Sequence, residues 1–123
     1  MSNRSAYKLK GFGPLYIINL DEQPERMEWM SNQLEEWEIK DYTRISAYDG
    51  RPSTGDDLSD IITGKYPESV TPGEIGCVTS HLKALKHFVE ETNEPYAIIM
   101  EDDCDISIAR FWTFTWRQFL SRM

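Results

Sequence analysis

The sequence predicts an α/β protein with a mostly parallel sheet and helices on both faces of that sheet. Three short segments have the length and composition of strands: the apolar residues 15–20 and 96–100, and residues 42–48, with Ile45 and Ala47 on one face. Two amphipathic stretches, at 24–37 and 71–93, separate them. The order strand, helix, strand, helix, strand is typical of parallel sheets, because each helix returns the chain to the starting edge of the sheet.

Composition limits the class of protein. The 123 residues are enough for one domain, and five Phe, six Tyr and four Trp argue against disorder. The net charge of −8 argues against a nucleic-acid partner. No apolar run approaches the ~20 residues that a transmembrane helix needs, so we expect a cytoplasmic protein. Cys77 and Cys104 are expected to be free thiols.

The first half of the chain divides into a leader and three elements. Residues 1–13 are polar and glycine-containing, which predicts a flexible leader, and residues 14–123 are expected to form the domain. The first strand ends near Asp21, and Pro24 suits the start of the first helix. A second strand precedes the turn signal Asp49-Gly50. Residues 51–70 predict a long loop with one helical turn near residues 58–62.

The second helix has the clearest signals in the sequence. Thr71 suits the N-cap, and Glu74 completes a capping box with it. The following apolar residues recur at helical spacing and predict one buried stripe, with Phe88 beside it: Ile75, Val78, Leu82, Leu85 and Val89. Glu74 and His81 lie at the edge of this stripe on a helical wheel. We therefore expect both residues where the helix meets the sheet.

An acidic cluster follows the third strand directly. Along an extended chain, Glu101, Asp103 and Asp105 would face one way and Asp102 the other. Carboxylates that converge repel one another unless a cation lies between them, and Mg²⁺ or Mn²⁺ suits such ligands. That metal would bridge a diphosphate and stabilise it as a leaving group. The alternative is a solvated acidic turn.

Two further groups of polar residues lie at the same predicted edge of the sheet. Asn19 and Asp21 end the first strand and Arg26 lies in the next turn, an arrangement that suits a nucleotide. The alternative for Arg26 is an exposed charge on the helix surface. His81 is a candidate base or hydrogen-bond partner of a ligand, and the alternative is a histidine that a backbone carbonyl satisfies.

Several of these segments resemble glycosyltransferase family 25, which includes bacterial lipooligosaccharide galactosyltransferases and collagen galactosyltransferase domains. Residues 16–21 (YIINLD), with Pro24 and Arg26, resemble the opening motif of the family. Residues 45–50 (ISAYDG) resemble its A-x-D-G turn. Residues 73–82 (GEIGCVTSHL) and 98–103 (IIMEDD) resemble its GEIGC…SH and EDD pair, the most specific part of the match.

The resemblance implies a GT-A fold with a Rossmann-like nucleotide-binding half, a UDP-sugar donor such as UDP-galactose, and Mn²⁺. Residues at the acidic motif would hold the metal and those of the other motifs would line the donor pocket. The expected metal ligands are Glu101, Asp103 and Asp105. The expected donor-binding residues are Asn19, Arg26, Asp49, Gly50, Ser80 and Asp102. The expected catalytic residues are Glu74 and His81.

Members of this family continue well beyond the acidic motif, so the resemblance implies that these residues form the N-terminal part of a transferase. The aromatic tail at residues 111–123 would then contact the missing C-terminal half or a partner. Partners are expected to be a nucleotide sugar and a glycan or lipooligosaccharide acceptor, with a location peripheral to the inner membrane face. The alternatives are a truncated, non-catalytic interaction module and a phosphate-ester hydrolase with Asp21 as its nucleophile.

Overall fold

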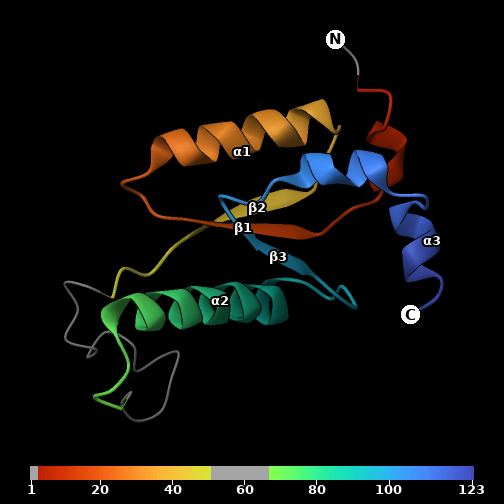
Figure 1. Cartoon of the computed structure of the whole chain (residues 1–123). Helices are drawn as coiled ribbons and strands as arrows, with labels where there is room; N and C mark the ends of the chain where they lie inside the picture. Colours follow the sequence, from red (N-terminus) through yellow and green to blue (C-terminus); the bar gives the residue numbers. More distant parts are fainter. Residues whose placement is uncertain (1–2, 51–66) are drawn as a thin grey trace.

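The computed structural model of the chain describes residues 3–50 and 67–123 (Figure 1). Three parallel strands form one sheet in the order β2-β1-β3. The strands are β1 (Leu15–Asn19), β2 (Tyr42–Ser46) and β3 (Ile98–Glu101). The α-helices are α1 (Pro24–Glu36), α2 (Pro72–Glu91) and α3 (Trp116–Leu120), and the 3-10 helices are η1 (Ala6–Leu9) and η3 (Ile106–Phe111).

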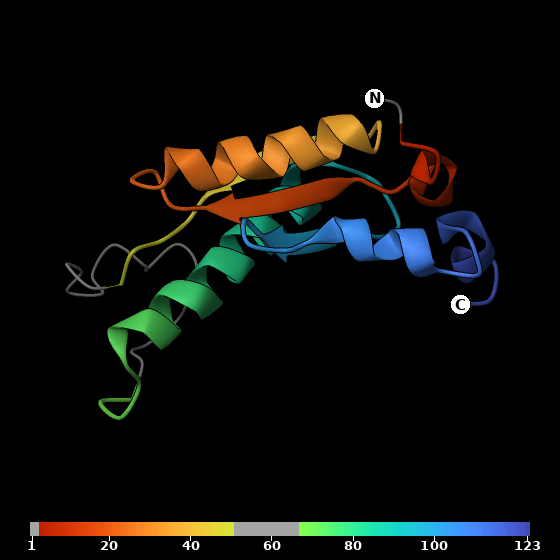
Figure 2. The ribbon, with the colours of Figure 1, turned by 45° about the horizontal axis from the view of Figure 1, so that its top comes forward.

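The central strand β1 is buried along its whole length and supplies both layers of the core. Successive side chains of a strand point to opposite faces. Leu15 and Ile17 therefore join the cluster under α1, η1 and η3, which includes Met30, Leu34 and Trp37. Tyr16 and Ile18 join the cluster under α2, which includes Ile45 and Ala84. The two helices consequently cover opposite faces of the sheet (Figure 2).

The predicted fold class is confirmed, and each predicted strand and long helix is present, with bounds within two residues of those expected. The predicted loop at residues 51–70 falls mostly outside the described residues, and the helical turn near residues 58–62 falls entirely outside them. Both cysteines are free, as expected.

The leader differs from its prediction. Residues 3–13 do not form a loose segment, because η1 packs against η3 and α3. Leu9 is buried in the core cluster with Trp37 and Ile106. Glycine content and polarity suggested flexibility, but the single apolar face of η1 has a partner in η3. Residues 1–2 lie outside the described part of the chain.

The orientation of α2 also corrects a prediction. Three residues of the expected buried stripe face away from the sheet, since Val78, Leu85 and Val89 are 49%, 45% and 73% exposed. Ile75 and Leu82 are half-buried, and Phe88 packs against the cluster under α2. The side that contacts the sheet instead carries the small or polar residues Gly76, Thr79, Ser80 and Ala84, all buried. Helical periodicity identifies an apolar face, but it does not determine which neighbour that face meets.

The aromatic tail packs partly on the molecule itself. Trp116 contacts the ring of Phe12 edge-on with their centroids 4.8 Å apart, and Trp112, Phe114 and Phe119 form stacked pairs beside it. Phe111 remains 77% exposed. Within residues 3–50 and 67–123, no helix combines the length and apolar character that crossing a membrane requires.

Candidate functional site

A pocket of about 340 Å³ lies at the carboxyl ends of the strands, between the sheet and the first turns of α2. Ligands of open α/β sheets bind at this edge, and the volume is in the range of small-molecule sites. Residues from all three strand ends and from α2 line the pocket: Ile18, Leu20, Gln23, Arg26, Ala47, Tyr48, Asp49, Gly50, Pro72, Gly73, Gly76, Cys77, Ser80, Glu101 and Asp102.

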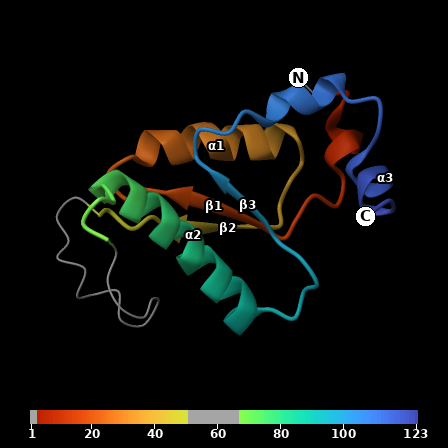
Figure 3. The same cartoon turned by 60° about the horizontal axis from the view of Figure 1, so that its bottom comes forward.

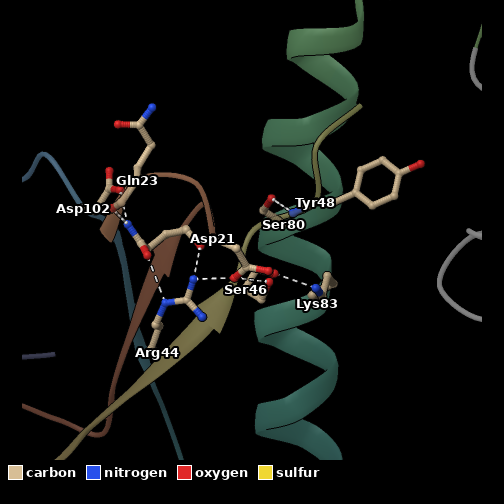
Figure 4. A network of polar contacts seen from close by, with 9 residues as sticks. Asp21, Gln23, Arg44, Ser46, Tyr48, Ser80, Lys83 and Asp102 are labelled. Atoms are coloured by element: carbon tan, nitrogen blue, oxygen red, sulfur yellow. Dashed lines mark hydrogen bonds and ion pairs between the residues drawn. The ribbon is translucent and has the colours of Figure 1, made fainter. Parts of the chain in front are cut away.

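Asn19 fixes the carboxylate at the end of β3. Asn19 is 2% exposed, and its amide Nδ2 donates to Asp102 Oδ2 at 2.7 Å and to the carbonyl of Gln23 at 2.9 Å (Figure 4). Arg26 Nη1 lies 3.8 Å from Asp102 Oδ1. Asp102 is only 7% exposed, and these partners offset the free-energy cost of burying its carboxylate. Its carboxylate is thereby held at the border of the pocket.

Arg44 organises the polar groups between β1 and β2. Its Nε donates to Asn19 Oδ1 at 2.9 Å, and its Nη2 donates to Asp21 Oδ1 at 2.6 Å. Ser46 Oγ also donates to Asp21 Oδ1, at 2.9 Å. The hydrogen bonds from Arg44 and Ser46 lower the pKa of Asp21 below its ordinary value. Asp21 is therefore a structural anion that orients Arg44.

The opposite wall depends on close contact between α2 and the chain after β2. Ser80 Oγ accepts from the backbone N–H of Tyr48 at 2.9 Å and donates to the carbonyl of Gly76 at 2.6 Å. A Cβ on Gly76 would lie 2.9 Å from the Tyr48 carbonyl oxygen, and one on Gly50 would lie 2.3 Å from that of Pro72. Only glycine fits at both positions, so these glycines shape the wall.

Comparison with known proteins agrees with this geometry. Residues 12–114 match the family described as "Glycosyltransferase family 25 (LPS biosynthesis protein)". The chain belongs to glycosyltransferase family 25. The predicted resemblance is thus confirmed, and the matched residues include every strand of the sheet and all residues that line the pocket.

Three curated relatives match most of this chain. A "Glycosyltransferase 25 family member" of Aedes aegypti is 34% identical over 76% of the chain, and one of Drosophila pseudoobscura pseudoobscura is 31% identical over 72%. The "Procollagen galactosyltransferase 1-A" of Xenopus laevis is 29% identical over 79%. The alignments cover 16%, 15% and 17% of these relatives, respectively. No solved structure matches the chain.

The structure brings together six of the residues expected from the family 25 motifs. Those that line the pocket are Arg26, Asp49, Gly50, Ser80, Glu101 and Asp102. Asn19 is not among the lining residues, since its side chain lies beneath them and holds Asp102. Asn19 is thus a positioning residue rather than part of the pocket surface.

The structure does not bring the three expected metal ligands together. Strand β3 ends at Glu101, and a turn follows it, so the alternation of an extended chain does not continue. Asp103 is exposed and outside the pocket lining. Asp105 Oδ1 accepts from the backbone N–H and the hydroxyl of Ser107, which lowers the pKa of Asp105. Across the described residues, no group of three His, Cys, Asp or Glu side chains is placed to hold a metal ion.

The expected catalytic pair also lies outside the pocket lining. Glu74 is exposed, and it takes part in the N-cap of α2 through the hydroxyl of Thr71. His81 Nδ1 lies 2.9 Å from the carbonyl oxygen of Cys77, one turn earlier in the same helix. The alternative of a backbone-satisfied histidine therefore describes the structure. That prediction assumed that the apolar stripe of α2 packs on the sheet, but another side of the helix does so.

Sequence analysis missed Arg44 and Lys83. Lys83 Nζ donates to the carbonyl of Ser46 and ties α2 to the end of β2. A charged residue within a predicted strand was the available signal for Arg44, because such a residue needs a partner when the strand is partly buried. No comparable signal distinguished Lys83 from other helix-surface lysines.

Proposed function

We propose that this chain forms the donor-binding part of a metal-dependent glycosyltransferase. In this proposal the donor is a UDP-hexose, with galactose as the sugar, and the acceptor is a glycan or lipooligosaccharide. The observation that carries the proposal is that the acidic residues Glu101 and Asp102 line one pocket with Arg26 at the carboxyl edge of a parallel sheet.

The strand order supports a nucleotide ligand at this edge. The chain goes from β1 to β2 on one side and returns to β3 on the other side of β1. The direction in which strands are added to the sheet therefore reverses at β1, and open α/β sheets bind ligands at such a switch point. Leu20 follows β1 and Asp102 follows β3, and both line the pocket.

The donor set fits a divalent cation that is shared with a diphosphate. Glu101 and Asp102 supply hard carboxylate oxygens. Mg²⁺ and similar ions need only one or two protein carboxylates when phosphate oxygens and water complete their coordination, so a group of three is not required. When bound, the ion would neutralise the diphosphate and stabilise it as a leaving group.

Other groups of the pocket suit the remainder of the donor. Arg26, with its side chain 56% exposed, is free to turn from Asp102 toward a phosphate. The first turn of α2, with Gly73 in the lining, directs the positive end of a helix dipole at the pocket. Asp49 and Gly50 would face the nucleoside or sugar.

The sugar and the acceptor are proposed from the names of the family and its relatives. Galactose is suggested by the name of the Xenopus laevis relative, and a lipopolysaccharide-type acceptor by the family description. A cytoplasmic location remains our expectation from the sequence.

The test is calorimetric titration of the chain with UDP, with and without Mn²⁺. We expect binding that requires Mn²⁺ and that Glu101→Gln or Asp102→Asn weakens about tenfold or more, because each substitution removes an anionic ligand. Asp103→Asn is the matched control, since Asp103 is adjacent and exposed but outside the pocket lining.

Two outcomes would contradict the proposal. One is UDP binding that is indifferent to Mn²⁺, and the other is a loss in Asp103→Asn equal to that in Glu101→Gln. Glu101 is exposed, so its substitution should leave the fold intact, and circular dichroism checks this. The hydrolase alternative has no comparable support, because Asp21 is held by Arg44 and Ser46 and is not among the pocket-lining residues.

A further inference from the structure

The charges of this acidic protein are divided sharply along the chain. Residues 1–13 and 106–123 contain none of the 21 Asp and Glu residues. They contain six of the 13 basic residues: Arg4, Lys8, Lys10, Arg110, Arg117 and Arg122. The intervening residues carry all of the negative charge. Random placement of charges along the chain does not explain such a division.

The fold brings the two basic segments together. Lys8 Nζ donates to the carbonyl oxygen of Arg110. A Cβ on Gly11 would lie 3.7 Å from Arg117 Nε, so these two residues are neighbours. η1 contacts both η3 and α3. Residues 3–13 and 106–123 therefore form one unit, which we call the basic end, and it lies at the opposite end of the molecule from the first turn of α2 (Figure 3).

The basic end also carries a concentration of exposed apolar side chains. Of the 12 large hydrophobic residues exposed in the described part of the chain, six are found in these two segments. They are Tyr7, Ile108, Phe111, Phe114, Phe119 and Met123, with exposed fractions from 39% to 86%. Phe111 and Ile108 project from η3 next to Arg110 in sequence. Basic and exposed apolar side chains thus belong to the same unit.

We propose that the basic end binds the surface of an anionic lipid bilayer. Lys and Arg are attracted by anionic headgroups, while aromatic and aliphatic side chains enter the boundary between headgroups and acyl chains. This surface supplies both components at once. The rest of the protein is acidic, so repulsion would orient the molecule with the basic end toward the bilayer and the pocket away from it.

The structure favours a lipid surface over other acidic or apolar partners. A second copy docked through the same end would bring six cations against six cations. A peptide that adds as a strand or docks as a helix would need a sheet edge or a groove. η1, η3 and α3 are short and offer neither, whereas a bilayer requires no groove. Acidic residues border the basic end, among them Asp41 beside Gly13, so binding should depend on ionic strength.

The test is co-sedimentation of the full chain with phosphatidylcholine vesicles, with and without phosphatidylglycerol. We expect binding only to the anionic vesicles at low salt, and release as NaCl approaches about 0.5 M. The double variant Phe111→Ser/Arg117→Gln should lower the partition coefficient by about tenfold or more. The control Val89→Ser/Lys86→Gln removes one basic residue and one similarly exposed apolar residue from α2, and it should bind as the wild type does.

Three results would overturn the proposal. The first is no binding to anionic vesicles at low salt. The second is an equal loss in the control variant, which would assign binding to overall charge and apolarity. The third is an affinity for soluble poly-L-glutamate that equals the affinity for vesicles and is unchanged by Phe111→Ser. That result would indicate an acidic protein partner. The test requires no nucleotide binding, so its result is independent of the proposed function.

Discussion

At the residue scale, Asn19 connects the strand ends that border the pocket. Its amide donates to Asp102 on one side, and its carbonyl oxygens accept from Arg44 on the other. An asparagine suits this position because its side chain is both donor and acceptor, so it links a carboxylate to a guanidinium without adding charge. The arrangement fixes the Asp102 carboxylate while little of it is exposed.

The link between Asn19 and Asp102 should be measurable as a coupling energy. We expect Asn19→Ala to reduce the free energy of unfolding by about 1–3 kcal/mol, because it leaves a buried carboxylate without its donor. In Asn19→Ala/Asp102→Ala the combined loss should be smaller than the sum of the single losses, by at least about 0.5 kcal/mol. Urea unfolding of the four proteins gives this value, and additive losses would contradict the link.

Asp21 should make stability depend on acidity. Hydrogen bonds from Arg44 and Ser46 lower its pKa in the folded protein below the ordinary value, so its ionised form stabilises the fold at neutral pH. That contribution is present above the unfolded-state pKa and is lost as the pH falls through the folded-state pKa. Asp21→Asn should therefore be less stable than the wild type at pH 7, and the difference should shrink as the pH falls through the lowered pKa of Asp21. A stability difference that persists unchanged in acid would contradict the role assigned to Arg44 and Ser46.

Residues were predictable where their position in the chain determined their place in the fold. Asp102 follows β3 directly and Arg26 lies in the first turn of the helix after β1, so the parallel order was enough to bring them to one edge. Asp103 and Asp105 were misplaced because the chain turns after Glu101, and side-chain alternation holds only in a strand. The sequence indicated Asn19 as a site residue. Its burial could not be predicted, because it depends on a contact with Arg44, 25 residues away.

At the element scale, α2 packs on the sheet through small residues. Gly76, Ser80 and Ala84 recur every fourth residue and are buried, which lets the helix backbone approach Tyr48 and Gly50. Close approach is what brings the first turn of α2 to the pocket. The apolar periodicity gave the existence and length of α2, but the spacing of small residues was the signal for its orientation. The larger residues were given more weight in the prediction.

The two glycines of this segment should respond oppositely to substitution. Gly76→Ala would place a Cβ 2.9 Å from the Tyr48 carbonyl, and this overpacking should destabilise the protein by on the order of 1 kcal/mol despite the better helix propensity of alanine. Gly73 has no atom within 4 Å of its added Cβ, so Gly73→Ala should raise stability by up to about 1 kcal/mol. Chemical unfolding measures both, and equal effects would contradict the packing described for α2.

At the scale of the whole molecule, the first turn of α2, which lines the pocket, lies at one end and the basic end lies at the other (Figure 3). The sequence pattern predicts that the strands are parallel, but it does not predict their order in the sheet. That β1 is central depends on its burial on both faces, which its unbroken apolar run did indicate. The partnership of η1 with η3 and α3 depends on contacts between segments about 100 residues apart, which local patterns do not reveal.

The central claim is that a divalent cation and a nucleotide diphosphate meet at Glu101 and Asp102. Paramagnetic broadening of assigned amide resonances by Mn²⁺ tests it most directly, because broadening reports the distance of each amide from the ion. With UDP present, we predict the strongest loss of signal at Leu20, Gly76, Glu101 and Asp102, and none at Tyr7 or Phe119. Broadening centred on Asp105, or broadening that is unchanged by UDP, would contradict the account.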